Sequence, residues 1–196
     1  MDKIKVKNIF AAINNKSFLD SLLAILDPES ANFWGTEGTV KYLKSKGFAA
    51  QSVVLGFDFD GRLKSISREI FARILADRSK KSHLEELRKQ GPTLSRATTG
   101  SDPVFTEPID LVTVDLYAPD KNNFPESMDI GGQALIRAAI KNYKNVALAF
   151  DKESIGALVD HLKTNQGSTL LRFRKNQAKK ASRFIAERCK LEADLF

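Results

Sequence analysis

The chain has 196 residues, and its 31 lysines and arginines exceed its 24 aspartates and glutamates, which gives a formal net charge of +7. This length suits one domain with a core of its own. A single cysteine, Cys189, excludes an intramolecular disulfide and a thiolate metal cluster. The sequence starts without the apolar run of a signal peptide, and no stretch is apolar over the roughly 18 residues that a membrane span needs. We therefore expect a soluble, cytoplasmic protein that contacts no membrane.

The excess positive charge is concentrated near the C-terminus. Residues 172–190 contain eight basic residues and one acid, Glu187, so the rest of the chain is neutral. A basic block can bind nucleic-acid backbones, but no aromatic side chains alternate with these charges and no nucleic-acid motif accompanies them. We therefore expect a helix with a solvated face, and no nucleic-acid partner.

Strands and helices alternate along the chain. The expected elements are a strand over Lys5–Ile13, helices over Phe18–Leu26 and Val40–Lys46, a strand over Ser52–Phe57, helices over Arg68–Asp77 and His83–Gln90, a strand over Leu111–Tyr117, a helix over Gln133–Asn142, a strand over Asn145–Phe150 and two further helices. The segment Gly91–Pro108 has three prolines and two glycines and is expected to be a long irregular loop. Alternating strands and helices indicate a Rossmann-like α/β fold with a mostly parallel sheet flanked by helices.

Four turns could carry chemistry, because ligands of open α/β sheets bind where strands end and helices begin. They are Asn14–Ser17, Gly35–Thr39, Asp60–Ser65 and Met128–Gly132. Each also has a purely structural interpretation, as a turn, a solvated hairpin or a helix cap. Taken together they offer cations that suit a phosphate, one carboxylate and the phenol of Tyr117.

Five segments resemble one known family. These segments are GTEGTVKYLKSKG, DGRLKS, HLEELRKQG, IDLVTVDLYAP and MDIGGQALIRAAIKN. They are similar, in the same order, to motifs of the inosine monophosphate (IMP) cyclohydrolase domain of the bifunctional AICAR transformylase/IMP cyclohydrolase family. The last segment is the longest and most specific match. The resemblance implies a methylglyoxal-synthase-like fold and a homodimer.

The resemblance also implies a purine-nucleotide site. Its substrate-binding positions correspond to Asn14, Lys16, Ser17, Gly35, Thr36, Gly38, Thr39, Arg62, Ser65, Val114, Asp115, Ile130, Gly131 and Gly132, and its catalytic positions to Lys64, Tyr117, Asp129 and Lys141. The loop at 35–39 would cradle the 5′-phosphate together with the basic loop at 62–65. Val114 and Asp115 would lie at the base.

The implied reaction closes the pyrimidine ring of 5-formamidoimidazole-4-carboxamide ribotide (FAICAR) to give IMP and water. This chemistry needs no metal and no redox cofactor. The carboxamide nitrogen must lose a proton and the formyl oxygen must gain one. Asp129 paired with Lys141 could relay the amide proton. Lys64, Tyr117 and the amides near Gly131 could stabilise the developing negative charge.

Several positions depart from the family pattern. Ala12–Asn15 lacks two hydroxyls and an acid, Glu37 replaces a glycine, Ser67 a histidine, Asp115 an asparagine and Gln133 a proline. A non-catalytic purine-nucleotide binding or regulatory domain is therefore the alternative to the enzyme, and triose-phosphate chemistry is a weaker one.

The expected organisation is one cyclohydrolase-like domain. It divides into an α/β nucleotide-binding core at residues 1–167 and a basic helical C-terminal segment at 168–196, with no transformylase domain.

Overall fold

A computed structural model describes residues 2–53, 66–94 and 106–196 of the chain, with the backbone alone at 90–94. Its centre is a five-stranded parallel sheet in the order β4-β3-β2-β5-β6. The strands are β2 (Asn8–Ala12), β3 (Asn32–Gly35), β4 (Ala49–Ser52), β5 (Leu111–Val114) and β6 (Ala147–Ala149). The expected parallel α/β architecture is confirmed.

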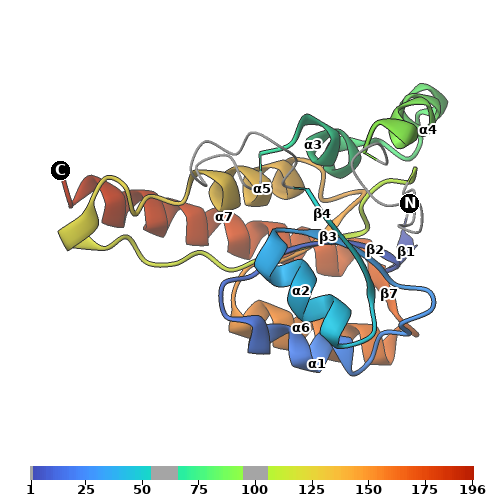
Figure 1. Ribbon diagram of the computed structural model, residues 1–196, viewed down its shortest axis with the longest axis horizontal. Helices are drawn as coiled ribbons and strands as arrows, with labels where there is room; N and C mark the ends of the chain where they lie inside the picture. The colour runs from blue at the N-terminus through green and yellow to red at the C-terminus, as the bar shows by residue number, and fades with distance from the viewer. Residues whose placement is uncertain (1, 54–65, 95–105) are drawn as a thin grey trace.

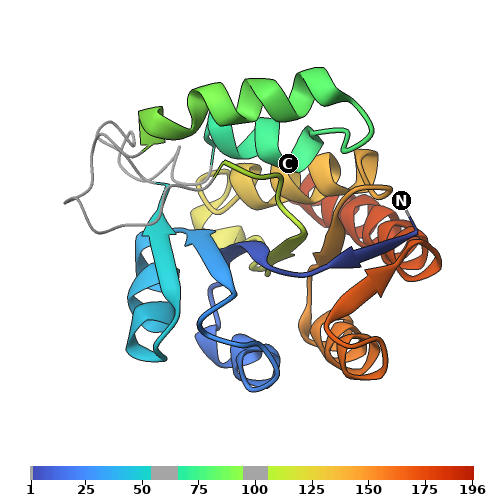
Figure 2. The same cartoon turned by 90° about the vertical axis from the view of Figure 1, so that its right-hand side faces the viewer.

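Helices cover both faces of the sheet, which makes three layers (Figure 2). One apolar core lies against α1 (Asp20–Leu23), which follows the short 3-10 turn Lys16–Leu19, and against α2 (Glu37–Ser45) and α6 (Lys152–Thr164). The second lies under α3 (Arg68–Leu75), α5 (Ile130–Lys141) and α7 (Leu171–Ala193). The helix α4 (Lys81–Leu94) packs outside α3. In the described part of the chain no helix has the length and apolar character required to cross a membrane.

Several predicted boundaries were wrong. The strand expected over Ser52–Phe57 ends at Ser52, and residues 54–65 lie outside the described part. The strand expected to reach Tyr117 ends at Val114. The loop expected from Gly91 begins later, because α4 continues through Gly91 and Pro92 to Leu94. Proline and glycine disfavour helix interiors only as a tendency, which the helix here overrides.

A second, two-stranded sheet was not predicted. β1 (Lys3–Lys5) pairs antiparallel with β7 (Ser168–Leu170), so that Ile4 lies opposite Thr169. Three residues a strand are too few for an alternating pattern to show in the sequence. The segment 168–196 therefore begins as a strand, and α7 follows it directly.

The basic residues of α7 have different surroundings. Arg174 is 1% exposed and donates hydrogen bonds to the carbonyl oxygens of Thr169, Tyr143 and Lys144 at 2.6, 3.1 and 3.0 Å. Most of the other basic side chains of this helix are exposed. The helix thus buries one cation as a structural anchor and presents a solvated basic face, as expected.

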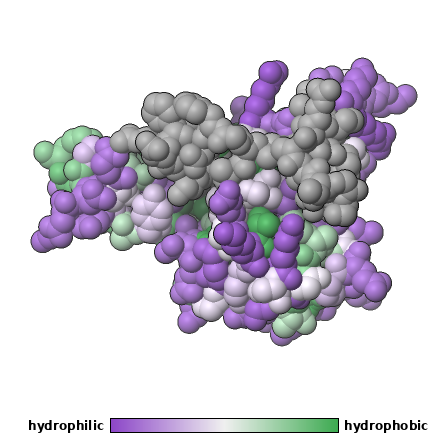
Figure 3. All heavy atoms as spheres, in the orientation of Figure 1, coloured by the Kyte–Doolittle hydropathy of each residue, from purple (hydrophilic) through white to green (hydrophobic). Residues whose placement is uncertain are grey.

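The end of α7 and the segment 117–129 form an arm that extends away from the sheet (Figure 1). The rings of Phe124 and Phe196 meet edge to face at 4.8 Å between centroids. The tip of the arm carries apolar surface (Figure 3), and Phe196 is 90% exposed. The base of the arm adjoins the start of α5 and the end of β5.

Gly35 ends β3 where that strand lies closest to β2. A Cβ atom at this position would lie 2.3 Å from the carbonyl oxygen of Ala11. Backbone atoms cannot retreat as a flexible side chain can, so a side chain here would force the two strands apart.

We expect Gly35→Ala to lower the free energy of unfolding by about 1–3 kcal/mol, the usual cost of overpacking. Gly156→Ala is the matched control, because this exposed position in α6 has no atom within 4 Å of an added Cβ. The control should gain about 0.5–1 kcal/mol from helix propensity. Chemical denaturation measures both, and equal stability of the two variants would contradict the strand-contact argument.

Candidate functional site

The carboxyl ends of β2, β3 and β5 meet at one edge of the sheet, and the loops that follow them carry most of the predicted site residues. Arg62, Lys64 and Ser65 are an exception, because they lie outside the described residues. The site is described below from the phosphate loop toward the arm.

Lys16 lies beside the start of α2. Its Nζ donates to the carbonyl oxygens of Ile13 and Asn14 at 2.5 and 3.0 Å. A Cβ atom built on Gly38 would lie 3.8 Å from the same Nζ. The first turn of a helix has unpaired amides and a partial positive charge, and among the described residues no side chain caps α2. The ammonium and this helix end together form a surface that suits an anion.

Thr39, also predicted to touch the phosphate, is fully buried. Its Oγ1 donates to the carbonyl oxygen of Ile13 at 3.2 Å, accepts from the Ile13 amide at 3.3 Å and lies 3.2 Å from Oγ1 of Thr36. Thr39 therefore ties α2 to the end of β2, and Gly35 lets β3 approach. Gly38 and Glu37 are the exposed residues of this loop.

Asp115 holds the first loop in place. Its Oδ1 accepts a hydrogen bond from the Asn14 amide, and its Oδ2 accepts one from the Asn15 amide at 2.9 Å. Oγ of Ser17 donates to Oδ1 of Asn15 at 2.8 Å within the same loop. Asp115 was expected at the base of the nucleotide, and the structure uses both of its oxygens to join the loops after β2 and β5. Carboxylate-to-amide bonds are charge-assisted and strong.

Val114, the other residue expected at the base, is 1% exposed and packs in the core with Phe10 and Val112. A contact of Val114 with a nucleotide would have to come from its backbone.

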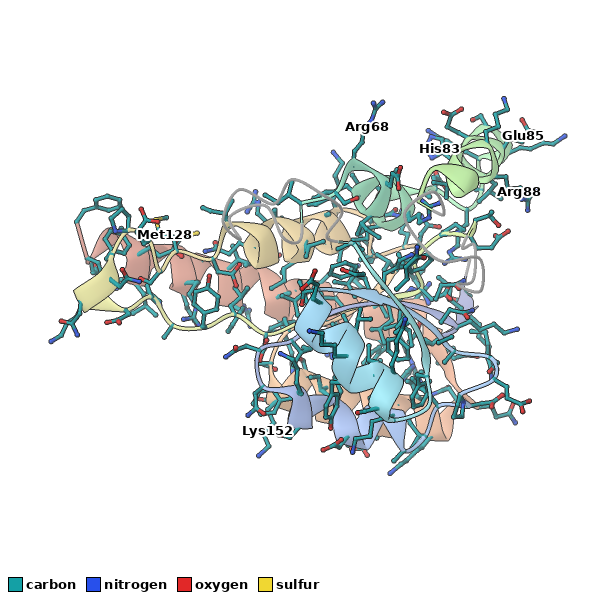
Figure 4. The ribbon with its side chains drawn as sticks, in the orientation of Figure 1. Arg68, His83, Glu85, Arg88, Met128 and Lys152 are labelled. Atoms are coloured by element: carbon teal, nitrogen blue, oxygen red, sulfur yellow. The ribbon has the colours of Figure 1, made fainter. Side chains whose placement is uncertain are left out.

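Asp129 begins α5. Its Oδ1 accepts a hydrogen bond from the Gly132 amide at 2.7 Å, so it is the N-cap of the helix. A Cβ on Gly132 would lie 2.8 Å from each carboxylate oxygen and 2.5 Å from the end of the Leu116 side chain, so a larger residue here would require these side chains to move. Ile130, in contrast, is 57% exposed. Figure 4 shows Met128, which directly precedes Asp129, in the arm where the chain returns to α5.

The structure brings Tyr117 and Asp129 together. Burial raises the pKa of Asp129, and so do the charges of Asp115 and Glu192, against the lowering effects of the Gly132 amide and Arg188. Burial and the charge of Asp129 raise the pKa of Tyr117. The phenol is 46% exposed and thus open to a ligand. A carboxyl and a phenol with raised pKa values beside each other are typical of sites that move protons.

Lys141 does not join this cluster, so the predicted pairing of Asp129 with Lys141 was wrong within one chain. Asp129 caps the first turn of α5, and Lys141 is its last residue. Twelve residues of helix separate their backbones by about 18 Å, more than the two side chains together can span. Lys141 is exposed at the far end.

Sequence reasoning missed the contribution of α7. Arg188 donates from Nη1 to the carbonyl oxygen of Tyr117 at 3.3 Å. Glu192 accepts from Nε2 of Gln133 at 2.6 Å, and Cys189 donates from Sγ to Oε1 of Gln133 at 3.7 Å. The four-residue spacing of Arg188 and Glu192 places them on one helical face, but nothing in the sequence says which element that face meets.

The chain is similar to proteins of purine biosynthesis. It is 30% identical over 189 residues to the bifunctional purine biosynthesis protein PurH of Bradyrhizobium diazoefficiens, an alignment that covers 90% of this chain and 33% of that protein. It is 31% identical over 181 residues to PurH of Rhodopirellula baltica, covering 86% of this chain and 32% of that protein. The chain thus spans about a third of the length of the curated relatives it matches. A scan against protein-family models found no match.

A solved structure shares the fold. The crystal structure of ForH superposes with a TM-score of 0.75 at 24% identity, covering 97% of this chain and 99% of that one. The parallel sheet with helices on both faces is consistent with the methylglyoxal-synthase-like arrangement expected from the sequence.

We expect Asp115→Asn to loosen the loop after β2, because an asparagine side chain has one acceptor oxygen where the carboxylate has two. Hydrogen exchange of the Asn14 and Asn15 amides should accelerate at least severalfold. Asp120→Asn is the control, since Oδ1 of Asp120 accepts from the Asn122 amide within its own turn. Unchanged exchange at Asn14 and Asn15 in Asp115→Asn would show that this carboxylate does not hold the loop.

Proposed function

We propose that this chain, which is a PurH-like domain, closes the pyrimidine ring of FAICAR to form IMP and water. The carboxamide nitrogen attacks the formyl carbon and loses one proton, and the formamido nitrogen loses a second proton as the ring C=N bond forms. The formyl oxygen takes up both protons and leaves as water. The relatives are named for purine biosynthesis, and the site described above supports this particular step.

The observation that carries the proposal is a continuous row of polar groups along the carboxyl edge of the sheet. Gly38 adjoins Lys16, which bonds the carbonyl of Asn14. The Asn14 amide bonds Asp115, whose charge acts on Asp129. An anion-binding helix end therefore lies at one end of the row and a proton-transferring pair at the other, as a nucleotide with a reacting base requires.

Asp129 is the proposed general base. Its raised pKa makes the carboxylate a stronger proton acceptor than an exposed aspartate. It would take the proton from the carboxamide nitrogen.

Tyr117 is the proposed hydrogen-bond donor. Because its pKa is raised, the phenol keeps its proton across the pH range in which enzymes of this kind would work. It would donate to the formyl oxygen as negative charge develops there. Holding the two arms of one substrate in attack geometry supplies much of the remaining rate.

The phosphate would bind at the first turn of α2 beside Lys16. Arg62 and Ser65 stay predictions for the same group, and Lys64 stays a prediction for stabilising the developing negative charge. The homodimer implied by the family resemblance also stays a prediction.

A second candidate is a non-catalytic purine-nucleotide binding domain. One observation favours it: Lys16 and Asp115, both expected to contact substrate, are bonded to backbone groups of this chain. Nucleotide binding without turnover is what this candidate predicts.

We expect the purified protein to convert fresh FAICAR to IMP between pH 6 and 9, followed by ultraviolet absorbance. A parallel thermal-shift panel of IMP, XMP and AICAR reports binding to the folded state, since a bound ligand raises the midpoint by mass action. Turnover supports the enzyme. A thermal shift without turnover supports the binding domain. Absence of both turnover and a thermal shift would refute both candidates.

We expect Asp129→Asn to lower kcat by about 10²–10⁴, the usual contribution of a positioned acid or base. Asparagine caps helices as well as aspartate does, so the fold should persist. In the wild-type protein kcat should rise with pH through the raised pKa of Asp129, because the deprotonated carboxylate is the active form. Stopped assays across pH 4–8 measure the loss of kcat in Asp129→Asn and the pH dependence of the wild-type kcat. Asp120→Asn is the active control. Retention of turnover in Asp129→Asn would remove Asp129 from the mechanism.

A further inference from the structure

Arg188 is held at two points beside the candidate site. Its guanidinium lies over the ring of Phe184, one turn earlier in α7, at 5.3 Å from the centroid. Its Nη1 donates to the carbonyl oxygen of Tyr117 at 3.3 Å. The side chain therefore lies against the segment that carries Tyr117, and the helix α7 runs beside α5 (Figure 1).

The Nε atom of Arg188 is buried and has no hydrogen-bond partner among the described residues. A buried guanidinium donor without a partner is costly in a folded protein. A conformation with this cost needs a compensating attraction, and the nearby carboxylates offer one.

The charged and titratable groups around Asp129 come from three elements. Asp115 and Tyr117 follow β5, and Glu192 and Arg188 project from α7. The Gly132 amide of α5 completes the set. The negative charges of Asp115 and Glu192 therefore act on Asp129 and raise its pKa. Arg188 supplies the opposing positive charge.

We propose that Arg188 is a positioning residue of the site, which fixes the backbone at Tyr117 and balances the carboxylates around Asp129 so that Asp129 can accept a proton. The proposal rests on the proposed function for its meaning in the reaction. Arg188 thereby supplies a positive charge near Asp129. Lys141 of the same chain cannot supply it, because it lies at the far end of α5.

The balance acts in a defined direction. With Arg188 present, its charge lowers the pKa of Asp129 against burial and the charges of Asp115 and Glu192. Without it, Asp129 would keep its proton to higher pH, and less of the reactive carboxylate would be present at any pH near its midpoint.

The test compares Arg188→Gln with Arg188→Lys. Lys190→Gln is the matched control, since it removes one positive charge from the exposed face of the same helix. We expect the acid limb of the kcat profile to move up by roughly one pH unit in Arg188→Gln, the lower end of the effect of a close opposite charge. Below the midpoint of the acid limb kcat should then fall by up to tenfold, with a smaller loss at high pH. Arg188→Lys should restore most of the acid limb, and Lys190→Gln should leave it unchanged.

A second measurement separates this proposal from the proposed function. The carboxyl carbon of Asp129, labelled with ¹³C and assigned through Asp129→Asn, reports its titration by NMR without any substrate. An upward displacement of its midpoint in Arg188→Gln supports the proposal even if the wild-type protein shows no turnover. Coincident titrations in wild-type and Arg188→Gln protein would overturn it. So would a kcat lowered equally at all pH values together with a fallen unfolding midpoint, which is the result of a purely structural role.

Discussion

The two central strands of this protein are fastened to each other at both ends by aspartates. Asp110 precedes β5 and accepts the amides of Lys7 and Asn8 at 3.0 and 2.7 Å, where β2 begins. Asp115 follows β5 and accepts two amides of the loop where β2 has ended. The register of the pair is therefore fixed twice, in addition to the ladder between the strands. The described loops of the candidate site follow β2, β5 or β3, which pairs with β2.

Asp110 and Asp115, at opposite ends of the strand pair, have different surroundings. Asp110 is 3% exposed and forms an ion pair with Arg78, which also donates to the carbonyl oxygens of Ile109 and Asn145. Burial raises the pKa of Asp110 against these partners. Asp115 is partly exposed and contributes negative charge to Asp129. Asp110 thus makes buried structural contacts at one end of the strand pair, whereas Asp115 adds negative charge to the site at the other end. Asp115 thus both holds the loop after β2 and adds negative charge near Asp129.

The sequence predicted the fold class because alternation of apolar runs with amphipathic segments is a local signal, but it did not predict the strand β3 (Asn32–Gly35). It also located Asp129 and Tyr117, which belong to motifs near each other in the chain. The pairing of Asp129 with Lys141 came from the family resemblance, whereas the sequence pattern predicted a helix from Gln133. It begins at Ile130, and a rigid helix holds the two groups apart. Arg188 reaches the site across 71 residues of sequence from Tyr117, and such a contact depends on packing angles that no local pattern encodes. The same holds for the pairing of β1 with β7.

The helix α7 combines roles that would ordinarily be separable. Ala181 and Ile185 lie in the core, Arg174 anchors the backbone of residues 143, 144 and 169, and Arg188 stands at the site. Truncating the chain before this helix would expose one face of the sheet, so the loss of any property on truncation would report unfolding. An affinity tag fused after Phe196 would sit on the arm, a short distance along α7 from Arg188. Charge-reversal at single exposed lysines, such as Lys175 or Lys179, is the change that alters the basic face and leaves the core and the site intact.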